Sequence, residues 1–548
     1  MTRITRHRNS TGHSSFQTSM KANLTGFGLQ RRSPPFLTLP SPRAADGLPC
    51  EAACSPSQRL DAVLTSGHRV DAVEPICSAS KAQPLNLMKV EAALTHSSSP
   101  CAPHHAETHL CISLPFSISF IANIARKRRE LNRDKTMHKL MDECLARMKQ
   151  ARDLPWQPKP CDLADRLSLQ DAAKGVGSAQ SLDQLAQDIM PYATGNTHPK
   201  FFGWVHGAGL PVSVGAEMVA ATMNSNCGGR DHGAIEVERA TLDWLLGVSG
   251  MPDTASAILT TGTSQATILG LTAARNRQFG HDVRKTGIQS LPKIAVYVRR
   301  GTHSCIGKAL EAMGYGTDAI HIVDTDENMR MDIASLALAV AEDQASGRVP
   351  LAVIGTAGSV NTGSFDNLDK IADFCAEFDI WFHVDAAFGF WAKLADQPWK
   401  QLTDGMERAN SISCDFHKWM SIPYDCGACM IYDRTLHFDT FTSRPNYLEQ
   451  QEEGLGGGDL WFCDYGLELS RGFRALKVWT AIKSIGTDAF SASITDNCKQ
   501  TFLMAELVEA SDLLELSFPV SSNVCCFYVA HGEALLHKSP LWRASPDP

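Results

Sequence analysis

Lys418 is the residue whose surroundings most clearly indicate chemistry. It lies in the run Ser413-Cys-Asp-Phe-His-Lys-Trp-Met, where apolar and aromatic side chains surround a single ammonium group. A buried ammonium must be paired or lose its proton, so a lysine in this setting can have a lowered pKa. The neutral amine is the nucleophile that Schiff-base chemistry requires. Taken alone, such a residue is more often a surface lysine, so other parts of the chain must decide between the two interpretations.

Asp385 is a second candidate because it directly follows a strand-like apolar run, in His383-Val-Asp-Ala-Ala. A carboxylate there can keep a pyridine nitrogen protonated, as in pyridoxal 5′-phosphate (PLP), and so make the ring an electron sink. An isolated aspartate after a strand is more often a cap or turn residue. It precedes Lys418 by 33 residues, which leaves room for one helix and a returning strand.

Two further strand ends carry polar groups. Thr260-Thr-Gly-Thr-Ser-Gln-Ala-Thr precedes a predicted helix, and small hydroxyl residues at a helix N-terminus can cradle a phosphate. An ordinary capped helix has the same composition, and the absence of a following Gly-Lys-Ser/Thr excludes a Walker loop. Gly301-Thr-His-Ser follows a run ending near Val298, so we expect His303 to lie flat against a cofactor ring.

Alternating strand and helix patterns must position these groups. Short apolar, often β-branched runs predict buried parallel strands, and the amphipathic stretches between them predict helices. The strand runs cover residues 257–259, 294–298, 351–354, 380–384 and 428–432, and the helical stretches cover residues 266–277, 331–342 and 367–378. These patterns predict a mostly parallel sheet covered on both faces, which binds ligands at the carboxyl ends of its strands.

The first part of the chain differs in composition from the rest. Residues 1–136 are rich in Ser, Pro, His and Arg, and the first acidic residue is Asp46. We expect a disordered extension there, with an organelle transit peptide or a biological start at Met137 as alternatives. Order is predicted to begin with a helix near Met137, followed by a helix that has Ser181 as its N-cap.

Composition limits the classes of function. The net charge of −8 and the pI near 6.2 argue against nucleic acid or an anionic membrane as a partner. No run reaches the ~18 apolar residues of a membrane span. The 17 cysteines follow no disulfide spacing, so we expect buried reduced thiols, and no metal site is expected at Cys426-x-x-Cys429.

A phosphate cradle, a strand-end histidine, a strand-end aspartate and a lysine thus occur in this order at predicted sheet edges. In these stretches the chain resembles the group II PLP-dependent decarboxylases of fold type I, the family of aromatic-amino-acid, glutamate and histidine decarboxylases. The resemblance covers roughly residues 140–538. It is carried by Thr261-Gly-Thr-Ser-Gln-Ala-Thr, Thr302-His-Ser, Thr356-Ala-Gly-Ser-Val-Asn-Thr-Gly-Ser-Phe-Asp, His383-Val-Asp-Ala-Ala, Phe416-His-Lys-Trp and Ser470-Arg-Gly-Phe-Arg-Ala-Leu-Lys-Val-Trp.

The resemblance implies an α/β fold in which a fold type I large domain with a mostly parallel sheet precedes a small α+β C-terminal domain. That small domain is expected to be truncated, because the chain stops at Pro548. The implied segments are a disordered extension (1–136), an N-terminal helical segment (137–195), a PLP-binding large domain (196–475) and a partial C-terminal domain (476–548). A homodimer with active sites at its interface is also implied.

The same resemblance implies how PLP, the expected cofactor, is held. Lys418 would form the internal aldimine with PLP, and His417 would lie beside it. Asp385 would pair with the pyridine nitrogen, and His303 would stack on the ring. The remaining contacts would be made by Thr263 and Ser264 at the phosphate and by Ala387 beneath the cofactor.

Decarboxylation of an L-amino acid to the amine and CO2, through an external aldimine and a quinonoid, is the reaction that the resemblance implies. The family places a tyrosine on a mobile loop after the lysine, and Tyr447 in Arg444-Pro-Asn-Tyr-Leu-Glu occupies that position. Tyr447 would protonate the quinonoid carbon after CO2 leaves. His198-Pro-Lys-Phe-Phe-Gly-Trp resembles the segment that lines the substrate side.

Departures from the family pattern leave the substrate open. Val360 and Asp415 stand where the aromatic-specific enzymes carry Thr and Asn, and Gln265 replaces a Glu in the phosphate loop. The alternatives are another PLP reaction on the same scaffold (aldehyde synthesis, aminotransfer or carbon–carbon lysis) and a truncated pseudoenzyme that binds PLP. We expect a cytoplasmic protein, with mitochondrial targeting by the N-terminal extension as the alternative.

Overall fold

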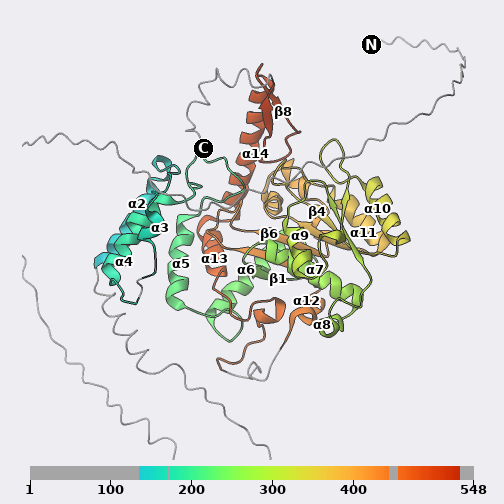
Figure 1. Ribbon diagram of the computed structural model, residues 1–548, viewed down its shortest axis with the longest axis horizontal. Helices are drawn as coiled ribbons and strands as arrows, with labels where there is room; N and C mark the ends of the chain where they lie inside the picture. Colours follow the sequence, from blue (N-terminus) through green and yellow to red (C-terminus); the bar gives the residue numbers. More distant parts are fainter. Residues whose placement is uncertain (1–134, 171–172, 444–453, 531–548) are drawn as a thin grey trace, which may run out of the picture. The chain divides into compact units, whose positions relative to one another are not determined.

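A seven-stranded sheet forms the centre of the fold in the computed structural model, which describes residues 135–170, 173–443 and 454–530 (Figure 1). The strand order is β1-β7-β6-β5-β4-β2-β3. Only β7 runs antiparallel to its neighbours, so the carboxyl ends of the other six strands lie at one edge. The strands are β1 (Ser256–Thr260), β2 (Ile294–Arg299), β3 (Ile320–Val323), β4 (Val349–Thr356), β5 (Trp381–Asp385), β6 (Ser411–Asp415) and β7 (Gly427–Ile431).

Side chains alternate between two hydrophobic cores, one on each face of the sheet. On one face, Leu259 and Phe382 pack with helices α6 (Gly233–Ser249), α10 (Ile333–Ala345), α11 (Leu368–Phe378) and α13 (Ala475–Ile485). On the other face, Ile258 and Trp381 pack with α7 (Thr263–Phe279) and α9 (Cys305–Ala312). Burial on both faces explains the continuous apolar runs of the sequence and confirms the predicted α/β class.

Smaller elements flank these layers. Before the sheet lie α2 (Lys135–Lys149), α3 (Leu163–Arg166), α4 (Ser178–Gln184) and α5 (Pro211–Met223). Between or after its strands lie α8 (Val283–Thr286) and α12 (Arg434–Phe441). The C-terminal part consists of α14 (Thr487–Glu509) and an antiparallel pair, β8 (Leu514–Leu516) and β9 (Phe527–Val529). No helix within the described ranges has an apolar stretch long enough to cross a bilayer.

Three local expectations are corrected. Ser181 lies inside α4, whose N-cap is Gly177 without a side-chain hydrogen bond. The patterns miss β3 because it is a short strand at the sheet edge, where only Val323 is buried. The segment between Asp385 and Lys418 contains the expected returning strand, β6, but not the expected helix. It forms three 3-10 turns before β6, in a stretch that Pro398 and Gly405 interrupt: Gly389–Leu394, Trp399–Thr403 and Met406–Arg408.

The cysteines behave as buried reduced thiols. All twelve within the described residues are free, and eight of them are buried. Burial raises the pKa of Cys414 and of Cys429, so both remain protonated and unreactive. The eight buried thiols agree with the expectation drawn from apolar sequence surroundings, whereas Cys525 and Cys526 are only partly buried despite theirs.

Arg471 joins the sheet to the helices on one face. Its Nη2 donates to Glu238 Oε1 of α6 at 2.6 Å and to the Leu259 carbonyl of β1 at 2.8 Å. Its Nη1 donates to the Cys227 carbonyl at 3.0 Å. The Arg471 and Glu238 side chains are at most 1% exposed. The Ser-Arg-Gly motif that contains Arg471 therefore has a structural explanation.

We expect Arg471→Met to destabilise the protein by about 3–5 kcal/mol, because it leaves the Glu238 carboxylate buried without its cation. Arg408→Met is the matched control. Arg408 pairs with Asp369 and Asp373 on the surface, and its loss is expected to cost less than about 1 kcal/mol. Urea unfolding of both variants measures the difference, and equal destabilisation would contradict the structural role of Arg471.

Candidate active site

Four strand ends meet at one cavity of about 360 Å³. The end of β1 leads into α7, β2 leads to His303, β5 ends at Asp385, and β6 ends three residues before Lys418. Because these strands run in one direction, their carboxyl ends lie at the same edge of the sheet. The lining includes every cofactor residue expected from the sequence: Thr263, Ser264, His303, Asp385, Ala387, His417 and Lys418.

The Asp385 carboxylate is buried and has weak partners. Its Oδ1 accepts a hydrogen bond from the Ala387 N–H at 3.2 Å, and the Cys305 thiol donates a long one to Oδ2 at 3.8 Å. Burial raises the pKa of Asp385, while Lys418, the Ala387 N–H and His303 act in the opposite direction. A carboxylate in this environment favours a cation close to it.

The opposite side of the cavity is suited to an anion. Helix α7 begins at Thr263, and its N-cap residue, Gly262, has no side chain that could cap it. The Thr263 hydroxyl is buried without a hydrogen-bond partner among the described residues. Gln265 accepts a hydrogen bond from the Thr261 N–H at 2.9 Å, so the amide oxygen keeps the acceptor function that a glutamate would have there. A helix N-terminus with an unpartnered hydroxyl can bind a phosphate.

Asp415 connects Lys418 to this helix. Its Oδ1 accepts a hydrogen bond from the Thr263 N–H at 2.8 Å, and its Oδ2 lies 3.0 Å from Lys418 Nζ. The Asp415 side chain is 3% exposed and that of Lys418 is 22% exposed. The sequence predicted a lysine among apolar groups, whereas the structure pairs its ammonium with a carboxylate and leaves it partly open to the cavity.

His417 lies beside this ion pair in a fixed orientation. Its Nδ1 accepts a hydrogen bond from the Cys426 N–H at 3.2 Å, and its Nε2 lies 3.6 Å from Asp415 Oδ2. Its ring packs on that of Tyr424, with centroids 4.4 Å apart. Burial lowers the pKa of His417, although Asp415 opposes the shift. A neutral ring that accepts at Nδ1 carries its proton on Nε2, facing Asp415.

A second cavity of about 220 Å³ adjoins the first, because His303, Asp385, Ala387 and Lys418 line both. Apart from Asp385 and Lys418, the described residues place no Asp, Glu, Lys or Arg side chain on its wall. Its other lining residues are Trp204, Val205, His206, Gly301, Thr356, Gly358, Ser359, Val360 and Phe388. The stretch starting at His198 therefore contributes to this cavity.

Sequence reasoning missed several lining residues. Asp415 has the same sequence signal as Asp385, because each is an acidic residue at the last position of a strand. The resemblance marks Asp415 only as a departure from the family pattern. Cys305 and Tyr424 had no recognisable signal, because their places depend on how the strand ends meet. The predicted acid Tyr447 lies outside the described residues.

These features fit PLP. The buried Asp385 carboxylate suits a protonated pyridine nitrogen, and the Lys418 amine suits the aldehyde. The N-terminus of α7 with the unpartnered Thr263 hydroxyl suits the phosphate. One cavity brings all three together, as a single cofactor of this type requires.

Comparisons with known proteins identify related sequences. An aromatic-L-amino-acid decarboxylase from Bacillus atrophaeus is 32% identical over 350 residues, which are 64% of this chain and 70% of the relative. An L-2,4-diaminobutyrate decarboxylase from Rhizobium meliloti (strain 1021) is 28% identical over 355 residues, which are 64% of this chain and 69% of that protein.

Solved structures share the fold. Oryza sativa TDC, solved with PLP and tryptamine, has a TM-score of 0.65 and 25% identity, covering 76% of this chain and 84% of its own. The glutamate decarboxylase domain of a Vibrio parahaemolyticus protein has a TM-score of 0.63 and 26% identity, covering 72% and 82%. These matches confirm the predicted fold type.

The family comparison covers most of the chain and includes every site residue described above. Residues 165–530 match the family model described as "Pyridoxal-dependent decarboxylase conserved domain". The match confirms both the predicted cofactor, PLP, and the predicted class of enzyme, a carboxy-lyase. The chain belongs to the pyridoxal-dependent decarboxylase family.

Proposed function

We propose that this enzyme converts an L-amino acid with an aromatic side chain to the corresponding amine and CO2. The observation that supports this reaction is that Asp385, Lys418 and Thr263 line one cavity. The relatives are named for aromatic amino acids, for diaminobutyrate and for acidic amino acids, so their names alone leave the side chain open. The lining of the adjoining cavity decides our choice among them.

A charged substrate side chain requires an opposite charge where it binds. An acidic side chain needs a Lys or Arg, and a diamino acid needs a carboxylate. The described wall of the second cavity offers only Lys418 and Asp385, both of which serve the cofactor in this proposal. Trp204, His206 and Phe388 instead present aromatic rings, which favour an uncharged aromatic side chain.

When bound, PLP supplies an aldehyde that captures an amine and a ring that withdraws electrons from the bond to the carboxylate. Lys418 would hold the aldehyde of the cofactor through its amine. Asp385 keeps the ring nitrogen protonated, and its burial strengthens that interaction. Asp415 accepts hydrogen bonds from both sides of the cavity and so orients the Lys418 amine.

The remaining residues bind and orient. In our proposal His303 lies against the ring, Ala387 packs beneath it, and His417 supports Asp415. Thr263 and Ser264 bind the phosphate at the start of α7. Tyr447 returns a proton to the substrate Cα, an assignment that rests on the sequence resemblance.

Domain organisation and assembly are part of the proposal. All described residues of the first cavity fall between 196 and 475, which supports a cofactor-binding large domain over that range. We assign residues 137–195 to an N-terminal helical segment and residues 476–548 to a C-terminal domain. The active unit is a homodimer, in which Tyr447 of one copy reaches the cavity of the other.

Lys418→Ala is expected to abolish both the visible absorbance band of the PLP–lysine link and CO2 release from a panel of L-amino acids. The methyl side chain has no amine to form the link. Lys370→Ala, which removes an exposed lysine of α11, is expected to keep both signals. Survival of the band in Lys418→Ala would refute the lysine assignment.

Asp385→Asn is expected to lower kcat/KM by about 10²–10³-fold while the absorbance band persists, because an amide cannot keep the ring nitrogen protonated. Circular dichroism of both proteins tests whether the variant keeps its fold. An unchanged kcat/KM would show that Asp385 has no electrostatic role in the reaction.

Asp385→Asn is also expected to change how the stability of the PLP-free protein depends on pH. Burial raises the pKa of Asp385, so the folded protein binds this proton more readily than the unfolded chain does. Stability therefore falls as pH rises from about 4, the ordinary pKa, through the raised value. Asp385→Asn should remove this loss and stabilise the PLP-free protein by about 1–3 kcal/mol at neutral pH. Urea unfolding at pH 5 and pH 8 measures both effects.

Val360→Arg is expected to lower kcat/KM for aromatic amino acids by at least about tenfold and to raise it for acidic ones, because it places a cation on the wall of the second cavity. Val360→Gln, which adds a long neutral side chain, is the matched control for size. Amine products and CO2 are quantified for each substrate. A wild-type enzyme that prefers acidic or diamino acids would contradict the proposed class while leaving decarboxylation intact.

Tyr447→Phe separates decarboxylation from the alternative PLP reactions. If Tyr447 supplies the proton at Cα, the variant should divert product from amine to aldehyde. Chromatography of both products gives the ratio. A wild-type enzyme that already forms aldehyde as its main product would contradict our proposal and favour an aldehyde synthase.

A further inference from the structure

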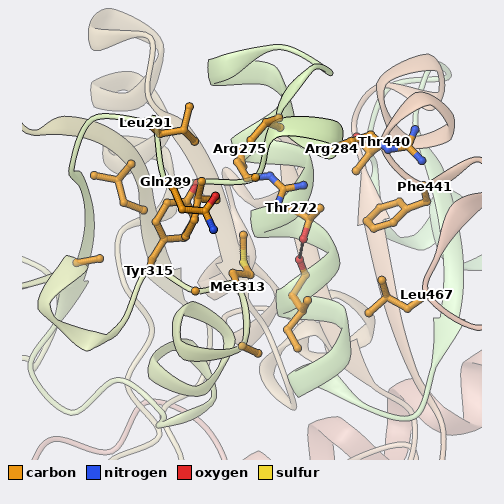
Figure 2. Close-up of a pocket in the computed structure, with 18 of the residues that line it drawn as sticks. Thr272, Arg275, Arg284, Gln289, Leu291, Met313, Tyr315, Thr440, Phe441 and Leu467 are labelled. Carbon is orange, nitrogen blue, oxygen red and sulfur yellow. Dashed lines mark hydrogen bonds between the residues drawn. The ribbon is translucent and has the colours of Figure 1, made fainter.

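A large cavity lined by described residues lies away from the active site. It has a volume of about 1230 Å³ and shares no lining residue with the two cavities that contain Asp385 and Lys418. Its walls come from the C-terminal half of α7, the loop before β2, the turn after α9, and α12 (Figure 2). Nothing in the proposed decarboxylation uses it.

The cavity is cationic. Its lining contains three arginines and one lysine but only one carboxylate, that of Asp318. Arg284 is held by the carbonyl oxygens of Asp439 and Thr442, at 2.7 and 2.6 Å. Arg348 is held by the Asp343 carboxylate and the Asp318 carbonyl. Both arginines therefore have fixed partners. The Asp343 carboxylate offsets the charge of Arg348, whereas the carbonyl partners of Arg284 leave its positive charge uncompensated.

Arg275, like Arg284, has a neutral partner, in this case a side-chain amide. Its Nε and Nη2 both donate to Asn276 Oδ1, at 3.1 and 3.0 Å. A guanidinium has five N–H donors, so three remain, including both on Nη1. No carboxylate of the described residues lies within ion-pair distance of Arg275, and burial lowers its pKa. A half-buried guanidinium that has free N–H donors and no carboxylate partner favours the binding of an anion beside it.

Tyr315 supplies a second donor beside Arg275. Its hydroxyl oxygen is buried and has no hydrogen-bond partner among the described residues. Burial raises the pKa of Tyr315 to about 12, against the opposing charge of Arg275, so the phenol keeps its proton. Figure 2 shows Tyr315 and Gln289 on one side of the Arg275 guanidinium, with Thr440 and Phe441 on the other.

We propose that this cavity binds a small organic monocarboxylate with an apolar body. Its two carboxylate oxygens accept hydrogen bonds from the free N–H groups of Arg275 and from the Tyr315 hydroxyl. The apolar body packs against Ile268, Met313 and Leu467, which line the same cavity. A carboxylate satisfies both donors while its body covers these apolar side chains, whereas inorganic phosphate has no apolar body to bury against them.

The site is placed on the helix that also begins the phosphate end of the active site. Arg275 follows Thr263 by twelve residues in α7, which corresponds to about 18 Å along a helix axis. Binding at one end of α7 is therefore physically separate from binding at the other. The inference does not depend on which amino acid the enzyme decarboxylates.

Isothermal titration calorimetry of the full-length, PLP-loaded enzyme with 3-phenylpropionate tests the proposal. Arg275→Met is expected to weaken binding by at least about tenfold, because it removes a charge-assisted bidentate contact. Tyr315→Phe should weaken it by about three- to tenfold. Arg277→Met is the matched control, because Arg277 lies on the same helix, pairs with Asp379 and does not line the cavity. Its affinity should equal that of the wild type.

Further measurements separate this site from other sources of binding. Inorganic phosphate at the same concentration should bind at least tenfold more weakly. Val360→Arg, which alters the active-site cavity, should leave the Arg275-dependent affinity unchanged. Absence of binding, equal binding of phosphate, or a signal that responds to Val360→Arg and not to Arg275→Met would each overturn the proposal.

Tyr315→Phe also guards against a failure of folding. It removes a hydroxyl without a partner, so its melting temperature without ligand should equal or exceed that of the wild type. With saturating 3-phenylpropionate, the wild type should gain more stability than the variant. If Arg275→Met does not fold, Arg275→Lys replaces it, since it keeps the charge but loses the bidentate geometry. Wild-type affinity in both Arg275→Lys and Tyr315→Phe would overturn the assignment.

Discussion

Asp415 makes the pair of contacts on which the geometry of the site depends. One oxygen accepts a hydrogen bond from the first backbone N–H of α7, and the other lies 3.0 Å from the Lys418 amine. Two segments separated by about 150 residues are thus held together at one buried carboxylate. Movement of either contact would change the distance between the phosphate end of the cavity and the lysine.

The sheet order makes this contact possible. β7 lies between β1 and β6, so the ends of β1 and β6 are brought close across a single antiparallel strand. Gly427, at the start of β7, leaves the necessary space. A Cβ atom there would lie 2.6 Å from Asp415 Oδ1 and 2.6 Å from the Gly262 Cα. Any side chain at residue 427 would separate the two loops that form the cavity.

Buried carboxylates in this protein fall into two kinds, and their partners distinguish them. Burial raises the pKa of Glu238, Asp366 and Asp385. Glu238 pairs with Arg471 at 2.6 Å, and Asp366 pairs with Arg299 at 3.1 Å, so both serve the fold. Asp385 faces a cavity with only a backbone N–H and a thiol beside it. A raised pKa therefore does not by itself separate a functional carboxylate from a structural one. Among these three, Asp385 is the one that lines the cavity and has no arginine partner among the described residues.

The amino-acid sequence alone determined the fold class, the family and most of the cavity lining, because buried strands read as apolar runs and the polar groups directly follow them. It did not reveal β3, which is short and exposed at the sheet edge. Nor did it reveal the pairing of Lys418 with Asp415 or the placing of Arg275 beside Tyr315. Asp415 and Lys418 are only three residues apart, but their contact depends on how the chain turns after β6, and Arg275 and Tyr315 belong to separate segments. Only the tertiary structure therefore decides which polar groups are satisfied and which remain free.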